Sequence, residues 1–237
     1  MNIPLKGNAM NAYRMIGRAC LLLALAASAA PAQKKDKKGE MGGKKNSDGV
    51  EFTSSCVCTA CQGKHRWDVK TDKSPAPASV AADHRITPSE LRKWTGPGGT
   101  IGKSTPRSGK EAEFFALTGE IRYARLEDDG DIHLQLADQG KGKKAKTASV
   151  EIPMGEPWCA IRQQLFGLLN VTLPVQFSKH KNVSPKSNTL ITVTGKAFYD
   201  AENDGDDSRA NDRTGSGSSQ TTVWEIHPVM KLVVGGK

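Results

Sequence analysis

The chain has 237 residues and a formal net charge of +9 at neutral pH, and only 5% of its residues are aromatic. Its positive charge is concentrated in the first 32 residues and in six lysines between positions 34 and 45, so the remainder carries only +2. Charge therefore does not mark the folded part as a basic, nucleic-acid-binding domain. The lysine-rich tail suits either weak, unselective polyanion or nucleic-acid binding or a solvated spacer.

The first 32 residues have the pattern of a signal peptide. Arg14 and Arg18 precede an apolar run, 21–30, that is too short to span a bilayer, and Ala30-Pro31-Ala32 fits the small-residue cleavage pattern. No later segment resembles a membrane span. We expect export to the periplasm or the extracellular space, with residues 33–55 forming a Lys/Gly-rich disordered spacer.

Residues 56–112 are predicted to form a cysteine-rich extension and linker with one short helix. Thr87-Pro88-Ser89-Glu90 combines an N-cap, a proline at the first helical position and a capping-box glutamate, so a helix should begin there and end before Gly96. The extension has too little apolar surface to fold alone. It should depend on the domain that follows it.

Residues 113–237 are predicted to form the folded domain. Loose alternation predicts a strand over 114–126, Asp128-Asp129-Gly130 predicts a hairpin, and alternation returns up to residue 136. Further strands are expected over 148–152, 190–199 and 222–234, with a polar, acidic loop over 200–220. A helix should follow Pro157, with its apolar face formed by Trp158, Ile161, Leu165 and Leu168.

This order predicts a mainly β fold: a five-stranded OB-like barrel with one helix between strands 3 and 4, plus an irregular, disulfide-bearing N-terminal extension. Gly119 and Gly195 fit the sharp strand bends of a small barrel, and Trp158 and Leu165 would plug its open end. A five-stranded sandwich would give a similar pattern.

Several segments resemble a family of exported bacterial proteins of unknown function. They are Phe115-Ala116-Leu117-Thr118-Gly119, Asp129-Gly130-Asp131-Ile132-His133, Pro157-Trp158-Cys159, Val193-Thr194-Gly195-Lys196-Ala197-Phe198, Val223-Trp224-Glu225-Ile226-His227-Pro228-Val229 and His65-Arg66-Trp67. The resemblance covers most of 56–76 and 113–235. It implies export and an OB-like fold, and brings no established activity.

The mature chain has four cysteines: Cys56, Cys58, Cys61 and Cys159. An even number in an exported protein indicates disulfides, and we expect one bridge within the N-terminal cluster and one from that cluster to Cys159. A zinc site of the three N-terminal cysteines and His65 is an alternative with an uncommon spacing. A redox role for Cys58-Thr59-Ala60-Cys61 lacks the βαβ context of thioredoxin-like proteins.

Two histidines lie on predicted strands, each with a carboxylate two residues earlier. Period-two geometry places His133 on the face of Asp131 and His227 on the face of Glu225, so either pair suits acid–base chemistry, a metal, or a surface ion pair. The Asp129-Gly130-Asp131 turn is also similar to the calcium-binding turn of staphylococcal-nuclease-like OB folds. Its plainer interpretation is an ordinary hairpin turn.

Aromatic and basic residues on a barrel face would suit stacking on bases or sugars; the candidates are Arg122, Tyr123, Lys196 and Tyr199. The sequence predicts no cofactor and no metal, and names no partner. The favoured function is an exported, non-enzymatic OB-like binding or structural module. The alternative is an extracytoplasmic hydrolase or nuclease that uses the neighbourhood of His133 and His227.

Overall fold

The computed structural model describes residues 50–52, 56, 63, 65–127, 129–171, 175–177, 182–203, 209–210 and 221–235. The predicted leader 1–32, nearly all of the spacer 33–55 and most of the acidic loop 200–220 lie outside these residues. None of the helices in the described ranges has the length and apolar character needed to cross a membrane.

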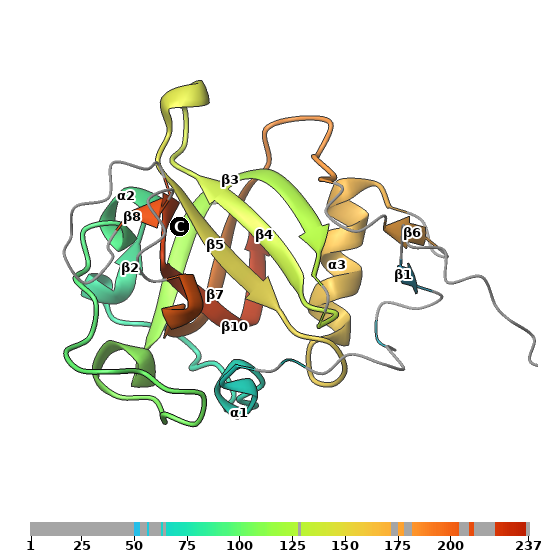
Figure 1. The fold of residues 1–237 in the computed structure, drawn as a ribbon. Helices are drawn as coiled ribbons and strands as arrows, with labels where there is room; N and C mark the ends of the chain where they lie inside the picture. Colours follow the sequence, from blue (N-terminus) through green and yellow to red (C-terminus); the bar gives the residue numbers. More distant parts are fainter. Residues whose placement is uncertain are drawn as a thin grey trace, which may run out of the picture. The chain divides into compact units, whose positions relative to one another are not determined.

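Five strands form a closed barrel: β3 (Phe114–Leu126), β4 (Ile132–Ala137), β5 (Thr147–Ile152), β7 (Leu190–Tyr199) and β10 (Trp224–Val234). Their spatial order is β3-β4-β5-β10-β7, and β7 pairs back onto β3 (Figure 1). β5 and β10 run parallel, whereas the other barrel pairs are antiparallel. The predicted OB-like barrel, with its helix between the third and fourth strands, is confirmed.

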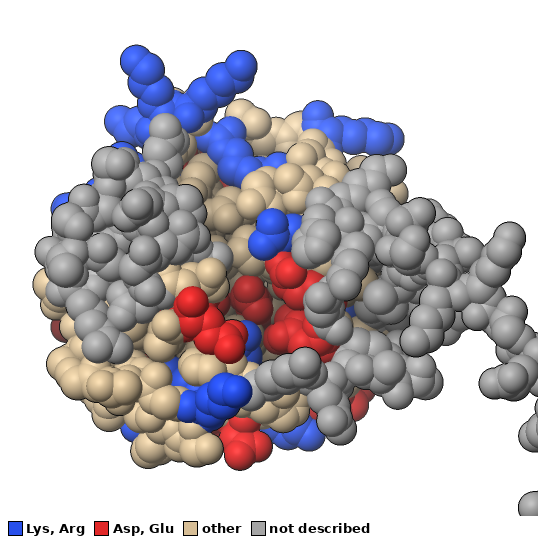
Figure 2. All heavy atoms as spheres, in the orientation of Figure 1, with Lys and Arg blue, Asp and Glu red and all other residues tan. Residues whose placement is uncertain are grey.

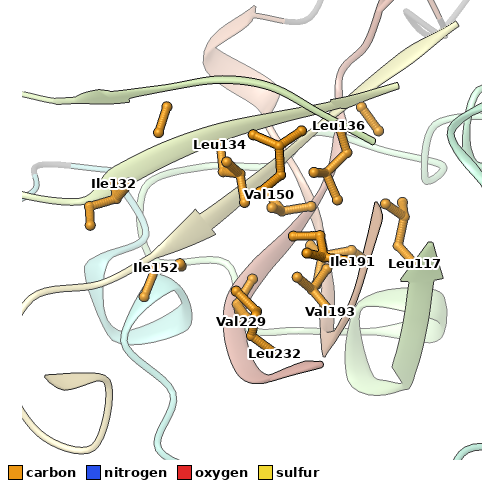
Figure 3. Packing of buried hydrophobic residues seen from close by; sticks show 14 of the residues in the cluster. Leu117, Ile132, Leu134, Leu136, Val150, Ile152, Ile191, Val193, Val229 and Leu232 are labelled. Atoms are coloured by element: carbon orange, nitrogen blue, oxygen red, sulfur yellow. The ribbon is translucent and has the colours of Figure 1, made fainter. Parts of the chain in front are cut away.

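The barrel is filled by the side chains that alternate inward along each strand. Leu134, Val150, Ile191 and Val193 are completely buried and point toward one another (Figure 3). Gly195 lies at a point of close approach, because a Cβ atom there would come within 2.2 Å of the Pro228 carbonyl oxygen. β10 is irregular at the same place, where its register to β7 shifts between Ile226 and Val229.

Helix α3 (Cys159–Leu169) lies at one end of the barrel (Figure 1). Leu165, Phe166 and Leu169 are its buried apolar residues and Trp158 precedes it, 1% exposed, whereas the predicted Ile161 and Leu168 are only partly buried. The buried face also includes Arg162, whose guanidinium donates hydrogen bonds to the carbonyl oxygens of Gly130 and Ile152 at 3.0 and 2.9 Å. An arginine therefore fastens this helix to the barrel.

Short elements surround the barrel. The predicted capping box is present at Thr87, although helix α2 (Pro88–Leu91) is only one turn long. The predicted last strand is divided into β9 (Thr221–Thr222) and β10. The remaining short elements are β1 (Val50–Phe52), α1 (Trp67–Lys70), η1 (Ala82–His84), β2 (Arg85–Ile86), η2 (Gly109–Ala112), η3 (Gly142–Lys144), β6 (Val175–Phe177), η4 (Ala201–Asn203) and β8 (Arg209–Ala210).

A disulfide joins the N-terminal extension to the barrel. Cys56 is bonded to Cys159 at the start of α3, 103 residues away in sequence, which confirms the predicted bridge from the extension to the helix. The alternative zinc site needs the Cys56 thiolate, which this bond consumes. Cys58 and Cys61 lie outside the described residues, so their bridge stays a prediction.

A buried ion pair provides a second attachment of the extension. The Arg66 guanidinium, 2% exposed, donates to both carboxylate oxygens of Glu111 at 2.7 and 2.8 Å, and the same carboxylate accepts the backbone N–H of Tyr199 at 2.8 Å. Removing one partner of such a pair leaves a buried charge without compensation, which is strongly destabilising. The pair should therefore be essential for the position of α1.

We predict that Glu111→Gln lowers the free energy of unfolding by about 3 kcal/mol, because Arg66 stays buried without a counter-charge. Urea denaturation of the purified protein measures this loss. The matched control is Glu113→Gln, since Glu113 forms a solvent-exposed pair with His84 and should change stability by less than about 1 kcal/mol. Equal effects of the two substitutions would contradict the importance of the buried pair.

Candidate functional site

Polar side chains occupy the outer face of the barrel where β4, β5 and β10 run side by side. Along β4 and β5 the apolar residues point into the barrel, so His133 and Glu151 point outward, and the two are direct partners in the antiparallel ladder. Along β10, Glu225 and His227 have the outward phase, and Glu225 is paired with Ser149 of β5. Three strands thus present acids and imidazoles to the same side.

His227 lies at the middle of this group. Its Nε2 atom is 3.2 Å from Oδ2 of Asp131, in the turn before β4, and its Nδ1 atom is 3.4 Å from Oε2 of Glu151. Nδ1 also lies 4.0 Å from Oε2 of Glu225, the carboxylate two residues earlier. We call Asp129, Asp131, His133, Glu151, Glu225 and His227 the His–carboxylate centre. Figure 2 shows acidic side chains gathered in a hollow on the face that carries β5.

His133 lies at the edge of the centre and has hydrogen-bond partners. Its Nδ1 atom is 3.1 Å from Oε1 of Glu151, and its Nε2 atom is 3.2 Å from Oε1 of Gln135. The ring of Tyr123 stacks on the imidazole, with 6.1 Å between the ring centroids. Glu151 therefore connects the two histidines, with one carboxylate oxygen toward each of them.

Asp131 and His227 are completely buried and yet have no hydrogen bond from either side-chain carboxylate oxygen or either ring nitrogen. Their facing atoms are close enough to attract, but their directions do not meet hydrogen-bond geometry. A buried polar group without a hydrogen bond costs about 1–3 kcal/mol. Such groups in a native fold require an explanation, and a bound ion is one of the recognised ones.

The centre carries an excess of negative charge. It contains four carboxylates, and among the described residues Lys70 of α1 and Arg162 of α3 are cations whose charges interact with them. Burial alone would lower the pKa of Lys70, but the surrounding carboxylates outweigh it and raise this pKa above its usual value. The ammonium group of Lys70 is therefore held in its charged form.

The pKa values of two carboxyl groups of the centre are shifted in opposite directions. Burial, together with the charges of Asp131 and Glu151, raises the pKa of Asp129 to about 6, against the opposing effect of Lys70. Burial would also raise the pKa of Glu151, but the hydrogen bond from His133 and the charge of His227 outweigh it and lower this pKa. Of these two carboxyl groups, Asp129 is the one that protonates first as the pH falls.

Helix α1 is tied to the strand that carries His227. Nη2 of Arg107 donates to the carbonyl oxygens of both Val69 and His227, each at 2.6 Å. The Phe198 ring lies 5.4 Å from the His227 ring, and Nζ of Lys70 is 5.6 Å from the centroid of Phe198. Arg107 therefore fixes Lys70 and His227 relative to each other.

The structure brings together the four residues that the sequence singled out for chemistry: Asp131, His133, Glu225 and His227. It adds Glu151, Asp129 and Lys70. Glu151 has the outward phase of a predicted strand, but it lies beside His227 only because β5 pairs with β10. Lys70 comes from the extension, and no sequence spacing connects it with the barrel strands.

The four residues proposed for stacking do not form one surface. Arg122 donates to the Gly142 carbonyl oxygen at 2.8 Å, and Lys196 is paired with Asp72 at 2.7 Å. Tyr123 packs on His133, whereas Tyr199 is fully buried in the barrel core and is not available to stack on a ligand. The prediction of a shared binding face by these four residues has no support in their positions.

No family model matches the chain, and neither a curated protein nor a solved structure matches it. The resemblance to exported bacterial proteins therefore stays a prediction. Function has to be inferred from the geometry and charge of the His–carboxylate centre.

We predict that Lys70→Met lowers the stability of the metal-free protein by about 1–3 kcal/mol, the range for leaving buried charged groups without a partner. The four carboxylates would lose the cation that α1 supplies. Thermal and urea unfolding in the presence of a chelator measure the effect. The control is Lys73→Met, three residues along the chain, which replaces an exposed lysine and should have almost no effect. Similar losses of stability for the two substitutions would contradict the role of Lys70 as the counter-charge of the carboxylates.

Proposed function

We propose that this protein is exported and that its barrel is a binding module for a cationic ligand, held at the His–carboxylate centre. A closed barrel is consistent with a binding or structural module. The observation that supports a cation is the group of four carboxylates, Asp129, Asp131, Glu151 and Glu225, whose charges all act on Lys70. Among the described residues, Arg162 also interacts with Asp129 and Asp131.

An anionic ligand is disfavoured at this site for the same reason. Desolvating like charges next to one another is strongly unfavourable, so a nucleic acid or acidic polysaccharide would be repelled by the centre. The lysine-rich segment 34–45, which lies outside the described residues, supports at most a separate, salt-sensitive attraction of polyanions. The cation and the polyanion would therefore bind different parts of the chain.

To test cation binding, we would measure the melting temperature of the chelator-treated mature protein with Zn²⁺, Mn²⁺, Ca²⁺, Mg²⁺, single-stranded DNA and an acidic polysaccharide. A ligand that binds only the native state raises the melting temperature, by an amount that grows with the logarithm of the ratio of ligand concentration to Kd. We expect at least one divalent cation to stabilise the protein, and Glu151→Gln to abolish the effect. Neither polyanion should stabilise the barrel once residues 33–50 are removed.

Asp83→Asn is the matched control, because Asp83 is an exposed acid in η1 and should leave the cation response unchanged. If no divalent cation stabilises the protein, or if Glu151→Gln and Asp83→Asn behave alike, the proposed function is wrong.

A second candidate function, hydrolysis of an ester or phosphodiester, is favoured by one observation. Sequence spacing places four residues in two separate pairs, but in the structure they lie in a single centre: Asp131, His133, Glu225 and His227. Of the two imidazoles His133 is the less buried, with an exposed side-chain fraction of 4% against 0% for His227, and Glu151 orients it. An activated water beside His133 would suit general acid–base catalysis.

Turnover of bis(p-nitrophenyl) phosphate by the cation-loaded protein tests this candidate. Hydrolysis that His133→Gln removes, while cation binding persists, would support an enzyme. Absence of turnover in the cation-loaded protein would leave the protein as a binding module.

The predicted export has its own test. Intact-mass analysis of protein recovered outside the cytoplasm should show cleavage after Ala32 and no thiol that reacts with an alkylating agent under denaturing, non-reducing conditions. A full-length chain that stays in the cytoplasm would contradict export. Labelling of two thiols would support the Cys56–Cys159 bridge alone and contradict the second predicted bridge.

A further inference from the structure

We propose that the cation is a divalent first-row transition metal ion, of the zinc and manganese class, and that Asp131, Glu151 and His227 are its protein ligands. This inference rests on the proposed cation-binding function and adds the ligand set and the class of metal. Each of the three residues offers a ligand atom, all three atoms lie within 4.8 Å of one another, and all three residues are buried.

The three ligands come from different strands of a rigid scaffold. Asp131 immediately precedes β4, Glu151 is on β5 and His227 is on β10, and these strands are adjacent in the barrel. A hydrogen-bonded ladder therefore fixes the separation of the three backbones. Sites placed on strands hold their ligand geometry better than sites on loops.

The distances within the group suit ligands of one ion better than hydrogen-bonded partners. Ligand atoms that lie about 2.0–2.2 Å from a common metal are separated from each other by about 3–3.5 Å. Nε2 of His227 is 3.2 Å from Asp131 and Nδ1 is 3.4 Å from Glu151, and neither contact qualifies as a hydrogen bond. Because opposite ring nitrogens make these contacts, one of them corresponds to the separation of two ligands of the ion, and the other lies on the far side of the ring. Two fully buried side chains, Asp131 and His227, thus have polar atoms aimed at each other without hydrogen bonds.

The orientation of the imidazole also fits a metal ligand. A histidine that binds a metal through one ring nitrogen usually donates its other N–H to a carboxylate or carbonyl oxygen. On His227 one ring nitrogen faces Asp131, and the other faces Glu151 and Glu225. When Nε2 binds the ion beside Asp131, Nδ1 still faces Glu225, a carboxylate outside the proposed ligand set.

The donor atoms determine the class of metal. One imidazole nitrogen with carboxylate oxygens suits Zn²⁺, Mn²⁺ and neighbouring transition metals, whereas Ca²⁺ and Mg²⁺ prefer oxygen ligands alone. The three proposed ligands include no thiolate, which would favour softer ions. A divalent ion would also offset negative charge that the carboxylates bring to the centre.

Neighbouring residues hold the ligands in place. Nδ1 of His133 contacts the second oxygen of Glu151, Arg107 binds the carbonyl oxygen of His227, and Phe198 packs on the His227 ring. We regard His133 and Arg107 as positioning residues. Loss of such an outer contact typically lowers metal affinity by 10–100-fold.

The experiment uses the mature full-length protein, treated with EDTA and then titrated with Zn²⁺, Mn²⁺, Co²⁺, Ca²⁺ and Mg²⁺ by calorimetry. We expect one equivalent of a transition metal to bind in preference to Ca²⁺ and Mg²⁺. His227→Gln, Asp131→Asn and Glu151→Gln should each weaken binding more than His133→Gln, for which a 10–100-fold loss is expected. His84→Gln, an exposed histidine paired with Glu113, is the control.

Folding of the variants is checked by circular dichroism and by melting in EDTA. Asp131→Asn should be at least as stable as the parent protein without metal, since it removes a buried, unpartnered carboxylate. The Co²⁺-loaded parent protein gives a measurement that needs no variant: a paramagnetically shifted, exchangeable imidazole N–H resonance in the proton NMR spectrum. That signal would show a histidine ligand directly.

The outcomes separate this inference from the proposed function. Binding of Ca²⁺ or Mg²⁺ but not of Zn²⁺, Mn²⁺ or Co²⁺ would contradict the transition-metal site and leave the cation-binding function standing. A Co²⁺ complex without an imidazole signal, or binding that His227→Gln leaves unchanged, would also overturn the ligand set. Absence of any divalent cation binding would overturn both.

Discussion

The parallel pairing of β5 with β10 is the constraint on which the rest of this structure depends. It closes the barrel between strands that are more than seventy residues apart in sequence, and it has only two registered residue pairs, Glu225 with Ser149 and Ile226 with Val150. The same pairing moves Glu151 next to His227 on the outer face. Without it the barrel would be open, and the two histidines would have no shared carboxylate.

The centre is unusual because the protein keeps four carboxylates together where little water reaches them. Buried ionic groups of this kind seldom stabilise a fold, and hydrophobic replacements are often neutral or better. The surrounding structure therefore has to hold them in place. Arg162 anchors α3 to the turn that contains Asp131, and Arg107 and the Arg66–Glu111 pair hold the extension with Lys70 against the barrel. The carboxylates belong to the barrel strands and the turn before β4, whereas the residues that hold the surrounding structure in place come from α3 and the extension.

Much of the barrel could be predicted because its strands alternate and its turns contain the residues that turns require. β3 and β7 have the predicted bounds. The inward residues of β7 keep a period of two, whereas β3 keeps it up to Ile121 and then changes phase at an irregularity, with Ala124 and Leu126 in the core. The same rule places Tyr199 in the core, because it lies an even number of residues from Ile191 and Val193 and so points inward with them. Lys196 points to the opposite face, so the two residues could not share one binding surface. Apart from α2, whose capping box was visible in the sequence, the short elements of the extension escaped prediction because tertiary contacts, rather than local patterning, determine them.

The centre itself was only partly predictable. The period of two within a strand predicts two pairs on a common face, Asp131 with His133 and Glu225 with His227. The carboxylates nearest to His227 are nevertheless Asp131 and Glu151, which come from other parts of the barrel. The sequence predicted no metal because each pair was considered alone, and two ligands do not make a site. A third ligand becomes visible only when strand order is known, and strand order depends on long-range pairing that local spacing does not encode.

Gly195 shows how far the requirements of the centre extend into the barrel. It contributes no side chain, yet it pairs with Val229, two residues after His227. A Cβ atom at this position would collide with the Pro228 carbonyl oxygen. Any larger residue would push β10 away from β7 and carry the imidazole with it. During evolution this position can accept almost no change, even though it never touches a ligand. Intolerance to substitution is therefore a poor guide to which residues of this barrel would bind the proposed metal ion.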